Sequence, residues 1–339
     1  VGNISISLIN GCVNQACCVL STSICNLNYA FYAIKSSQNY LVRKAIGGGQ
    51  PNINQDTIKQ LWLPLPALPE QERIAAFLDA ECAEIDAVLE KTRASIEEYK
   101  KLKQAVITQA VTRGIRGDRP MKDSGIEWIG EIPESWEVSS VRYIGQLQNG
   151  ISKGGEFFGK GFPFVSYGDV YKNYELPHSI SGLRDTTEDE RATYSVEYGD
   201  IFFTRTSETI EEVGFSCVCK RSIPNATFAG FIIRLRPFCA DEKILTDYAK
   251  YYFRGEHIRA YLVKEMNLVT RASLGQTLLK GMSVIVPPKS VQKEIAEYLD
   301  DKCADIDALV AKKQQYLTEI ENYKKSLIYE YVTGKKEVV

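Results

Sequence analysis

The sequence has no run of about 18 apolar residues, so no transmembrane helix is expected. It contains only two histidines, His178 and His257, and we interpret both as ordinary surface or core residues. The phosphate-binding pattern GxxxxGK[ST] is missing, and no GxGxxG follows a strand pattern. We also find no catalytic motif of the amino-methyltransferase type. These absences argue against an enzyme built around one of these sites.

Basic charge is not in excess, because the formal net charge is −2 and the pI is about 6.0. A basic domain is the usual footprint of a nucleic-acid-binding protein, so this balance counts against tight DNA binding by the isolated chain. The composition, 44% hydrophobic and 25% charged, is ordinary for a soluble globular protein. With 339 residues, about two domains with their own cores are expected.

The nine cysteines are an odd number without regular disulfide spacing, which favours a reducing, cytoplasmic location. One cluster exists, at Cys12, Cys17, Cys18 and Cys25. Its spacing does not fit a zinc site, which usually pairs one CxxC with another or with histidines. Cys217 and Cys219 alternate along a strand pattern, and we interpret them as packing residues. No metal and no cofactor is therefore expected.

The first residues, VGNISISLIN, include neither a basic n-region nor a small-residue cleavage site, so we expect no signal peptide. They also lack an initiator methionine. We expect from this that the chain begins inside a longer reading frame.

What the sequence does contain is an internal repeat. IAAFLDAECAEIDAVLEK (74–91) returns as IAEYLDDKCADIDALVAK (295–312), 221 positions further along. Over Gln71–Lys91, 11 of 21 residues are identical to their counterparts, where chance would give about one. The same register reaches Val111-Thr112 against Val332-Thr333. One chain therefore carries the same structural unit twice.

Both copies have the pattern of long helices that pair lengthwise, because apolar or tolerated residues recur at alternating steps of four and three. Polar residues interrupt both seams at the same two places, Thr92/Lys313 and Lys103/Lys324. The first seam is Leu78, Cys82, Ile85, Leu89, Thr92, Ile96, Tyr99, Lys103, Val106 and Ala110. The second is Leu299, Cys303, Ile306, Val310, Lys313, Leu317, Ile320, Lys324, Leu327 and Tyr331. Prolines precede both helices, and Gly114 and Gly334 lie just past their ends. We predict an antiparallel coiled coil; a dimerisation coiled coil is the alternative.

Between the helices, from about Lys122 to Pro288, short β-rich runs alternate with glycine turns. The runs are 162–170, 196–207, 213–220 and 226–237. They predict an α/β (α+β) domain around a twisted, largely antiparallel sheet. A helical stretch follows at 245–266.

The segment before the first long helix looks like the tail of the same domain. GNISISL (2–8) and QACCVLSTS (15–23) are strand-like, and 27–46 matches the helical stretch at 245–266, with Tyr32 near Tyr252. GQPNINQDTIKQLWLPLP (49–66) then parallels TRASLGQTLLKGMSVIVPP (270–288). The plan is therefore domain, helix, domain, helix.

Four stretches carry a family resemblance: LPLPALPEQERIAAFLD (63–79), SGIEWIGEIPESWEV (124–138), YGDIFFTRTS (198–207) and QPNINQ (50–55). Together they resemble the specificity (S) subunit of type I restriction-modification enzymes. The resemblance covers essentially the whole chain, and the motifs fall on the correct sides of the repeated helices. The second domain begins near Met121, so the repeat predicts that the first begins near position −100. About a hundred residues of the first domain are therefore expected to be missing before position 1.

The resemblance implies a non-catalytic subunit in which two target recognition domains each read half of a bipartite double-stranded DNA sequence. By the same resemblance, the long helices are expected to act as a spacer and as a docking surface for methyltransferase (modification) subunits, which would bind S-adenosylmethionine. Restriction subunits are expected to join the same complex. The expected organisation is 1–69, the C-terminal part of the first recognition domain; 70–114, a spacer helix; 115–288, the second recognition domain; and 289–335, a spacer helix.

Base edges and phosphates are read by arginine, lysine, amide and hydroxyl side chains. In the second domain such groups lie beside turns or strand ends at Lys153, Ser166, Tyr167, Thr204, Arg205, Thr206, Ser207, Arg271, Ser273 and Gln276. In the first domain they are Gln50, Asn52, Asn54 and Gln55. We predict that these residues include the DNA contacts. Arg205 paired with Glu208, a solvated Arg271 and Asn52 as a helix cap are the structural alternatives.

Two other functions remain open at this point. The repeated helices are also compatible with a coiled-coil scaffold that assembles partners without reading DNA. TEDE (187–190) is compatible with a nuclease metal site, although a solvated acidic loop is the simpler interpretation. If the DNA-reading hypothesis holds, the net charge predicts weak binding alone and strong binding in a complex whose other subunits hold the DNA.

Overall fold

The computed structural model describes residues 2–9, 11–45, 52–117, 119–152, 158–207, 213–265 and 272–338, with only the backbone at Phe158, Ser207 and Ala272. The chain forms two compact units. Unit 1 comprises Val1–Tyr99 and Ala308–Val339, and unit 2 comprises Lys100–Asp307.

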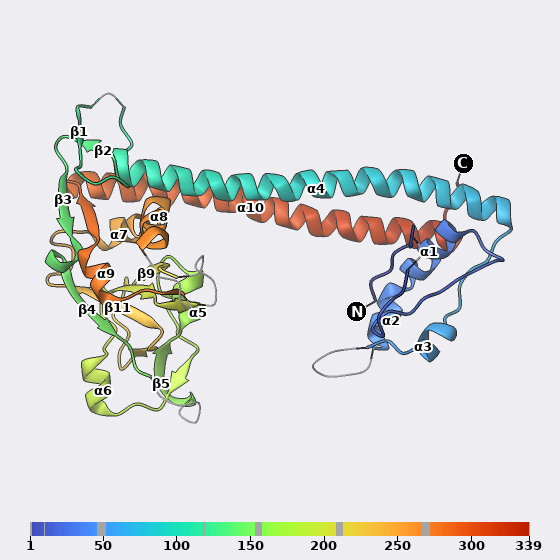
Figure 1. Ribbon diagram of the computed structural model, residues 1–339, viewed down its shortest axis with the longest axis horizontal. Helices are drawn as coiled ribbons and strands as arrows, with labels where there is room; N and C mark the ends of the chain where they lie inside the picture. Colours follow the sequence, from blue (N-terminus) through green and yellow to red (C-terminus); the bar gives the residue numbers. More distant parts are fainter. Residues whose placement is uncertain are drawn as a thin grey trace. The chain divides into compact units, whose positions relative to one another are not determined.

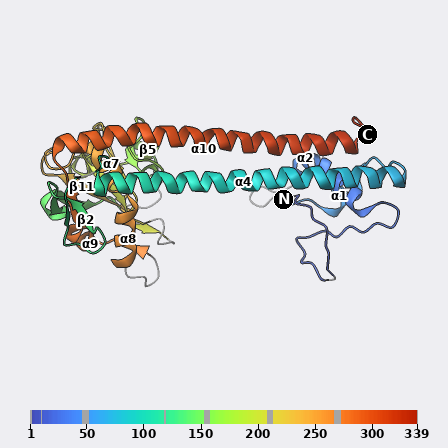
Figure 2. The same cartoon turned by 90° about the horizontal axis from the view of Figure 1, so that it is seen from above.

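Two long helices dominate the secondary structure. Helix α4 (Leu68–Arg113) has 46 residues and helix α10 (Lys289–Val332) has 44, which confirms the two helices expected from the repeat. They run side by side in opposite directions (Figures 1 and 2). Gly114 and Gly334 follow their C-termini with φ of 81° and 70°. This left-handed conformation favours glycine and ends a helix, as the sequence predicts.

Seam residues hold the helices together within each unit. In unit 1, Leu89, Ile96 and Leu317 form a buried cluster. The seam lysine Lys324 reaches across to Asp86 at 2.6 Å. Cross-helix ion pairs of this kind are satisfied in one register only, so they help to select it.

Unit 2 contains the equivalent ion pair in the other copy of the repeat. Lys103 Nζ lies 2.6 Å from Asp307 of α10. Lys103 and Asp307 are the counterparts of Lys324 and Asp86, 221 residues away in each case. The seam lysines Lys103 and Lys324 therefore act as register-setting contacts, one in each copy.

A tyrosine–aspartate hydrogen bond fixes a short helix to a long helix in each unit. In unit 1, Tyr32 of α1 (Leu27–Ser36) donates to Asp79 of α4 at 2.7 Å. In unit 2, Tyr251 of α7 (Thr246–Tyr252) donates to Asp300 of α10 at 2.6 Å. Asp79 and Asp300 are repeat partners, so the structural counterpart of Tyr32 is Tyr251, one residue before the predicted Tyr252.

A second tyrosine, one helical turn earlier, contacts the end of the other long helix. Tyr29 donates to the Val332 carbonyl at 3.4 Å, and Tyr248 donates to the Val111 carbonyl at 3.2 Å. Val111 and Val332 are again 221 residues apart. Both tyrosines are fully buried, so these hydrogen bonds form inside the protein core of their units.

A buried glutamine completes each junction. The Gln71 side chain accepts from the Asn26 amide at 2.9 Å and donates to the Pro66 carbonyl at 2.8 Å. Its counterpart Gln292 accepts from the Leu245 amide at 2.7 Å and donates to the Pro287 carbonyl at 2.8 Å and the Lys243 carbonyl at 2.9 Å. These amides satisfy backbone groups that burial would otherwise leave unpaired.

Unit 1 outside the long helices is helical and irregular. Its short helices are α1, α2 (Gln38–Arg43) and α3 (Gln55–Lys59), so the predicted helical stretch 27–46 is broken at Ser37. The strands predicted at 2–8 and 15–23 are wrong, because the described residues there form neither strand nor helix. A strand needs a neighbour to pair its backbone groups, and the described part of unit 1 supplies none.

Unit 2 contains several small sheets. Its strands are β1 (Met121–Asp123), β2 (Glu131–Pro133), β3 (Glu137–Ser140), β4 (Gly145–Asn149), β5 (Phe158–Val165), β6 (Leu183–Arg184), β7 (Ile201–Thr204), β8 (Thr206–Ser207), β9 (Ser216–Val218), β10 (Thr227–Phe228), β11 (Ile232–Pro237), β12 (Ala272–Ser273) and β13 (Ser283–Val286). The largest sheet has the order β4-β11-β7-β9 and is antiparallel throughout, as predicted. β10 pairs in parallel with β5, and β6 completes that sheet.

Besides the long helices, the described helices of unit 2 are η1 (Val141–Tyr143), α5 (Tyr167–Lys172), α6 (Glu188–Thr193), α7, α8 (Glu256–Glu265) and α9 (Gln276–Gly281). Two of them, α5 and α7, contact the largest sheet. In the predicted run 162–170 the strand ends at Val165 and α5 begins at Tyr167. In the run 196–207 strand β7 begins at Ile201. The helical stretch 245–266 is interrupted at Gly255, where a Cβ would lie 2.5 Å from the His257 ring.

The core of unit 2 joins the end of α4 to the sheet. Ile107 and Val111 of α4 belong to the same buried cluster as Trp136 and Tyr248. In Figure 1, α7 lies between the two long helices and strand β9. None of the described helices is both long enough and apolar enough to span a membrane.

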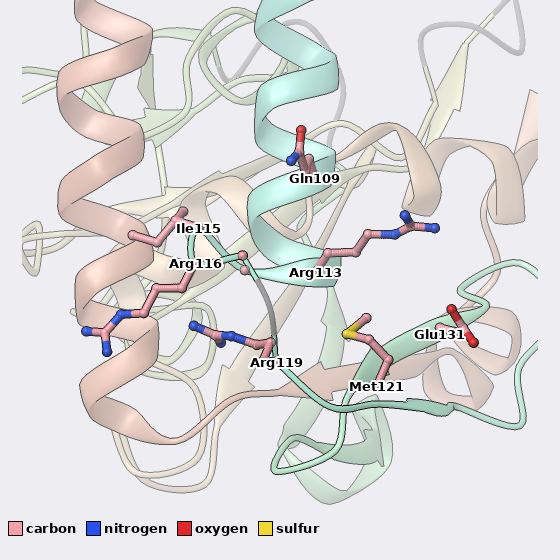
Figure 3. Close-up of a pocket in the computed structure, with 9 residues that line it drawn as sticks. Gln109, Arg113, Ile115, Arg116, Arg119, Met121 and Glu131 are labelled. Carbon is pink, nitrogen blue, oxygen red and sulfur yellow. The ribbon is translucent and has the colours of Figure 1, made fainter.

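We predict that Gln292→Leu lowers the free energy of unfolding of unit 2 by about 2–4 kcal/mol, because it leaves one buried amide and two carbonyls without partners. Urea unfolding followed by tryptophan fluorescence measures this. The control Gln109→Leu, at an exposed position of α4 within unit 2 (Figure 3), should change it by less than about 0.5 kcal/mol. Equal effects of the two substitutions would contradict the role assigned to Gln292.

We predict that His257 makes unit 2 acid-sensitive. It is buried between the rings of Trp128 and Tyr252, and burial lowers its pKa to about 3. The unfolded chain, with a pKa near 6.5, therefore binds the proton first, and stability is lost as the pH falls below about 6.5. From pH 7 to pH 5 this loss should be about 2 kcal/mol. Unfolding curves of His257→Phe should lack this loss, whereas His178→Phe, at an exposed site, should retain it.

Candidate nucleic-acid interface

Three strand ends meet at one end of the large sheet. The register places Ile233 opposite Asn149 and Ile232 opposite Thr204, so the C-termini of β4 and β7 flank the N-terminus of β11. Neighbouring antiparallel strands always bring such opposite ends together. Side chains just beyond these ends therefore share one surface. We call Asn149, Arg205, Thr206, Ser273 and Gln276 the polar sheet end.

A short ribbon brings two predicted groups together at this end. β8 pairs antiparallel with β12, with Ser273 opposite Thr206. The Leu274 amide donates to the Arg205 carbonyl at 2.7 Å, and the Leu274 side chain is fully buried. The group at 204–207 and the group at 270–276 are far apart in sequence, but the fold makes them neighbours.

The backbone of Arg205 is fixed by hydrogen bonds to neighbouring segments. Its amide donates to the Phe231 carbonyl at 2.9 Å, and its Nη1 donates to the Gly230 carbonyl at 3.4 Å. A Cβ on Gly230 would lie 2.1 Å from Ser152 Oγ, so a larger residue there would displace the Ser152 side chain. The guanidinium is half-buried, and one long hydrogen bond to the described residues uses few of its five N–H groups.

Two amides complete the polar sheet end. Gln276, at the start of α9, donates from Nε2 to Asn149 Oδ1 at 3.1 Å. Both side chains are half-buried. Asn149 was not among the predicted residues, because an asparagine before a glycine, here Gly150, is typical of a turn. Thr204, by contrast, is buried, and its hydroxyl oxygen accepts from the Phe215 amide at 2.9 Å, so it stabilises the strand end.

Gly199 and Asp200 hold the N-terminus of β7, at the opposite end of the strand from Arg205. Gly199 has a φ of 86°, and Asp200 after it is fully buried. The carboxylate accepts from Arg236 of β11 at 2.7 and 2.6 Å. Hydrogen bonding to Asp200 raises the pKa of the Arg236 guanidinium above its usual value. A buried two-point ion pair of this kind ties β7 to its neighbour β11.

Ser166 and Tyr167 are used by the fold itself. Ser166 caps α5: its hydroxyl oxygen accepts from the Asp169 amide at 3.3 Å, and Asp169 accepts from the Ser166 amide at 2.8 Å. This reciprocal arrangement is a capping box. The Tyr167 ring stacks on Tyr171 at 6.0 Å. Neither residue belongs to the polar sheet end.

Some predicted residues cannot be placed. Lys153, Arg271 and Gln50 lie outside the described residues, as does Glu208, the alternative partner of Arg205, and Ser207 is described by its backbone only.

The predicted residues of unit 1 lie around α3. Asn54 caps this helix by accepting from the Thr57 amide at 2.7 Å. The cap is therefore Asn54 rather than Asn52, which was considered for this role. Asn52 and Gln55 are exposed.

The acidic run at 187–190 has a structural role. Thr187 caps α6, its hydroxyl oxygen accepting from the Glu190 amide at 3.2 Å, while Glu190 accepts from the Thr187 amide at 2.8 Å. Acidic residues in a first helical turn interact favourably with the helix dipole. Among the described residues, no three histidine, cysteine, aspartate or glutamate side chains are grouped to hold a metal ion.

The polar sheet end is suited to hydrogen bonding rather than to bond cleavage. A guanidinium, two amides and two hydroxyls are the groups that discriminate base edges. They project from turns and strand ends held by a rigid sheet, where binding residues are typically found.

Comparison with known proteins gives consistent matches. A model of the "Type I restriction modification DNA specificity domain" matches residues 1–98 and 133–321. The MjaVIII type I restriction enzyme specificity subunit of Methanocaldococcus jannaschii is 25% identical over 91% of this chain and 70% of its own length. The EcoKI specificity subunit of Escherichia coli K12 is 24% identical over 88% of this chain. The chain spans 62% of the EcoKI subunit's length.

A solved structure concerned with complex assembly and conformational transition of the type I R-M system has the same fold. It aligns with 91% of this chain and 71% of its own chain, with a TM-score of 0.67 and 17% identity. The family model covers well over half of the sequence, on both sides of the unmatched residues 99–132. The chain therefore belongs to the type I restriction modification DNA specificity domain family.

Proposed function

We propose that this chain is a non-catalytic DNA-sequence-recognition subunit of a type I restriction-modification complex. The observation that carries the proposal is membership of the DNA specificity domain family, through matches at 1–98 and 133–321. The substrate is double-stranded DNA. Methylation and cleavage would belong to partner subunits, so the chain itself needs no cofactor.

The polar sheet end is the surface that we assign to base reading. Arginine donates two hydrogen bonds to guanine, and asparagine or glutamine pairs with adenine through its amide. Arg205, Asn149 and Gln276 supply these groups from three different segments. Lys153 and Arg271 remain predicted contacts, as do Gln50, Asn52 and Gln55 for the other half of a bipartite target.

The long helices are the proposed docking surface for methyltransferase subunits, which bring S-adenosylmethionine, and for restriction subunits. Val88 and its repeat partner Leu309 are 40% and 43% exposed. Leu102 and its partner Tyr323 are 48% and 56% exposed. Apolar residues exposed at the same positions in both copies fit two copies of one partner. A scaffold alone would need these surfaces but would not need the polar sheet end.

The isolated chain should bind DNA weakly. Its net charge of −2 offers little general attraction to phosphates, so most of that attraction would come from the assembled complex. The reducing cytoplasm is the proposed location, because all nine cysteines are free and partners and DNA would meet there.

Co-expression with a methyltransferase subunit of the same system, followed by base-resolution sequencing of methylated host DNA, tests the proposal. A gapped motif with two different halves is expected if both recognition regions read DNA. A single or symmetric motif would restrict reading to the second. No methylation despite normal assembly would overturn the DNA-reading function in favour of the scaffold.

We predict that Arg205→Ala relaxes the methylation motif at one position, or weakens specific DNA binding about 10- to 100-fold, because a bidentate base contact contributes about 1–3 kcal/mol. Methylation sequencing and fluorescence anisotropy of the purified complex measure this. Arg221→Ala, an exposed arginine away from the sheet end, is the matched control and should change neither quantity. Complex assembly should be normal for both. An unchanged motif and affinity for Arg205→Ala would exclude Arg205 as a base-reading residue.

A further inference from the structure

One large apolar side chain stands beside the polar sheet end. Phe231, the residue immediately before β11, is 63% exposed. A single exposed apolar side chain is common on protein surfaces and needs no explanation by itself. The position of Phe231 relative to Arg205 is what indicates a function.

Phe231 lies directly opposite Arg205. The register of β7 and β11 places Ile232 opposite Thr204, and the next pair outward in the same register is Phe231 and Arg205. A hydrogen bond supports this pairing, since the Arg205 amide donates to the Phe231 carbonyl at 2.9 Å. Opposite residues of antiparallel strands direct their side chains to the same face, with Cβ atoms about 5 Å apart. The phenyl ring and the guanidinium are therefore neighbours on one face.

The turn that carries Phe231 is fixed on both sides. The Ile232 amide donates to the Ala229 carbonyl at 3.0 Å and closes the turn. The Gly230 amide donates to the Ile151 carbonyl at 2.8 Å, which ties the turn to the segment after β4. A ring on such a fixed backbone has few torsions left to order when it meets a ligand, so binding costs it little entropy.

The fold itself gains little from this ring. The two buried clusters formed by the described residues of unit 2 contain Phe202, Phe203 and Phe228, and Phe231 is in neither cluster. A phenylalanine stabilises a fold by removing its apolar area from water, so a ring left largely in water contributes little. The ring is therefore available for an apolar contact outside the chain.

We propose that Phe231 packs against the 5-methyl group of a thymine close to the base that Arg205 reads. In the major groove, arginine bonds to the edge of guanine, and the thymine methyl is the apolar group exposed in the same groove. Phenylalanine is one of the side chains that contact this methyl. The proposal rests on the DNA-reading function argued above, and it adds an apolar contact to a surface that otherwise offers hydrogen bonds.

The geometry limits where this thymine lies. The Cβ atoms of an opposite pair are about 5 Å apart, and neighbouring base pairs are about 3.4 Å apart along the duplex. The thymine should therefore lie within about two base pairs of the position that Arg205→Ala affects.

Replacing thymidine with deoxyuridine tests the contact, because deoxyuridine pairs in the same way but lacks the 5-methyl group. Fluorescence anisotropy measures binding of the methyltransferase complex to a duplex with the methylated motif and to duplexes in which each thymine of the motif is replaced in turn. For the unmodified chain, one replacement at the expected distance should weaken binding about fourfold, the effect of one buried methyl group. Phe231→Ala should weaken binding to the thymine duplex at least as much, and the same replacement should then have almost no further effect.

Phe238→Ala is the matched control. Phe238 follows β11 directly and is also 63% exposed, but it lies at the opposite end of that strand from Phe231. Its substitution should leave both the affinity and the deoxyuridine effect unchanged. Circular dichroism and co-purification of the methyltransferase subunit check the folding and assembly of both variants.

Three results would overturn the proposal. An equal deoxyuridine effect in the unmodified chain and in Phe231→Ala would show that the ring does not meet the methyl group. A motif without thymine at the expected distance would exclude the contact. Loss of the methyltransferase subunit from a folded Phe231→Ala variant would make the ring a protein-docking residue. Failure of the proposed function is distinguishable, because then the unmodified complex would not prefer the motif duplex to one of scrambled sequence.

Discussion

The buried hydrogen bonds between the short and long helices are the interaction on which each unit depends. In unit 2, Gln292 satisfies three backbone groups, and Tyr251 bonds to Asp300 from α7. Helix α7 packs in turn against the sheet whose end carries Arg205. Unit 1 repeats the junction through Gln71, Tyr32 and Asp79. A change at such a junction should therefore be felt at the polar sheet end, although it lies outside that surface.

The proposed base-reading residues and the residues that stabilise the fold are separate groups within unit 2. The ion pair of Asp200 with Arg236 and the cap formed by Ser166 are enclosed by the fold and stabilise strands and helix starts. Arg205 and Gln276 stand beyond the strand ends, on backbone fixed by neighbouring segments. This division allows the surface residues to vary with the DNA sequence while the sheet stays the same.

The long helices were predictable because their information is local and periodic. The heptad seam, the repeat at 221 residues and the terminal glycines each indicate the helices, and the structure confirms them. The strands expected near the N-terminus failed for a physical reason: residue type indicates that a segment suits a sheet, but pairing depends on a neighbour elsewhere. The role of Ser166 as the N-cap of α5 could have been predicted from Asp169 three residues later, because this spacing is typical of a capping box.

The polar sheet end was only partly predictable. Arg205, Thr206, Ser273 and Gln276 were chosen because polar residues beside turns suit DNA contacts. Their proximity, and the inclusion of Asn149, depends on strand order and register. Strand order and register cannot be predicted from the local sequence, because neighbouring strands of a sheet are distant along the chain.

The most direct test of the account exchanges residues 121–287 for the corresponding segment of a family member with a known, different methylation motif. Both long helices and residues 1–120 stay unchanged, and purification of the assembled complex controls for folding. The account predicts that one half of the methylated motif changes to that of the donor while any other half is retained. An unchanged motif from a normally assembled complex would contradict the assignment of sequence reading to unit 2.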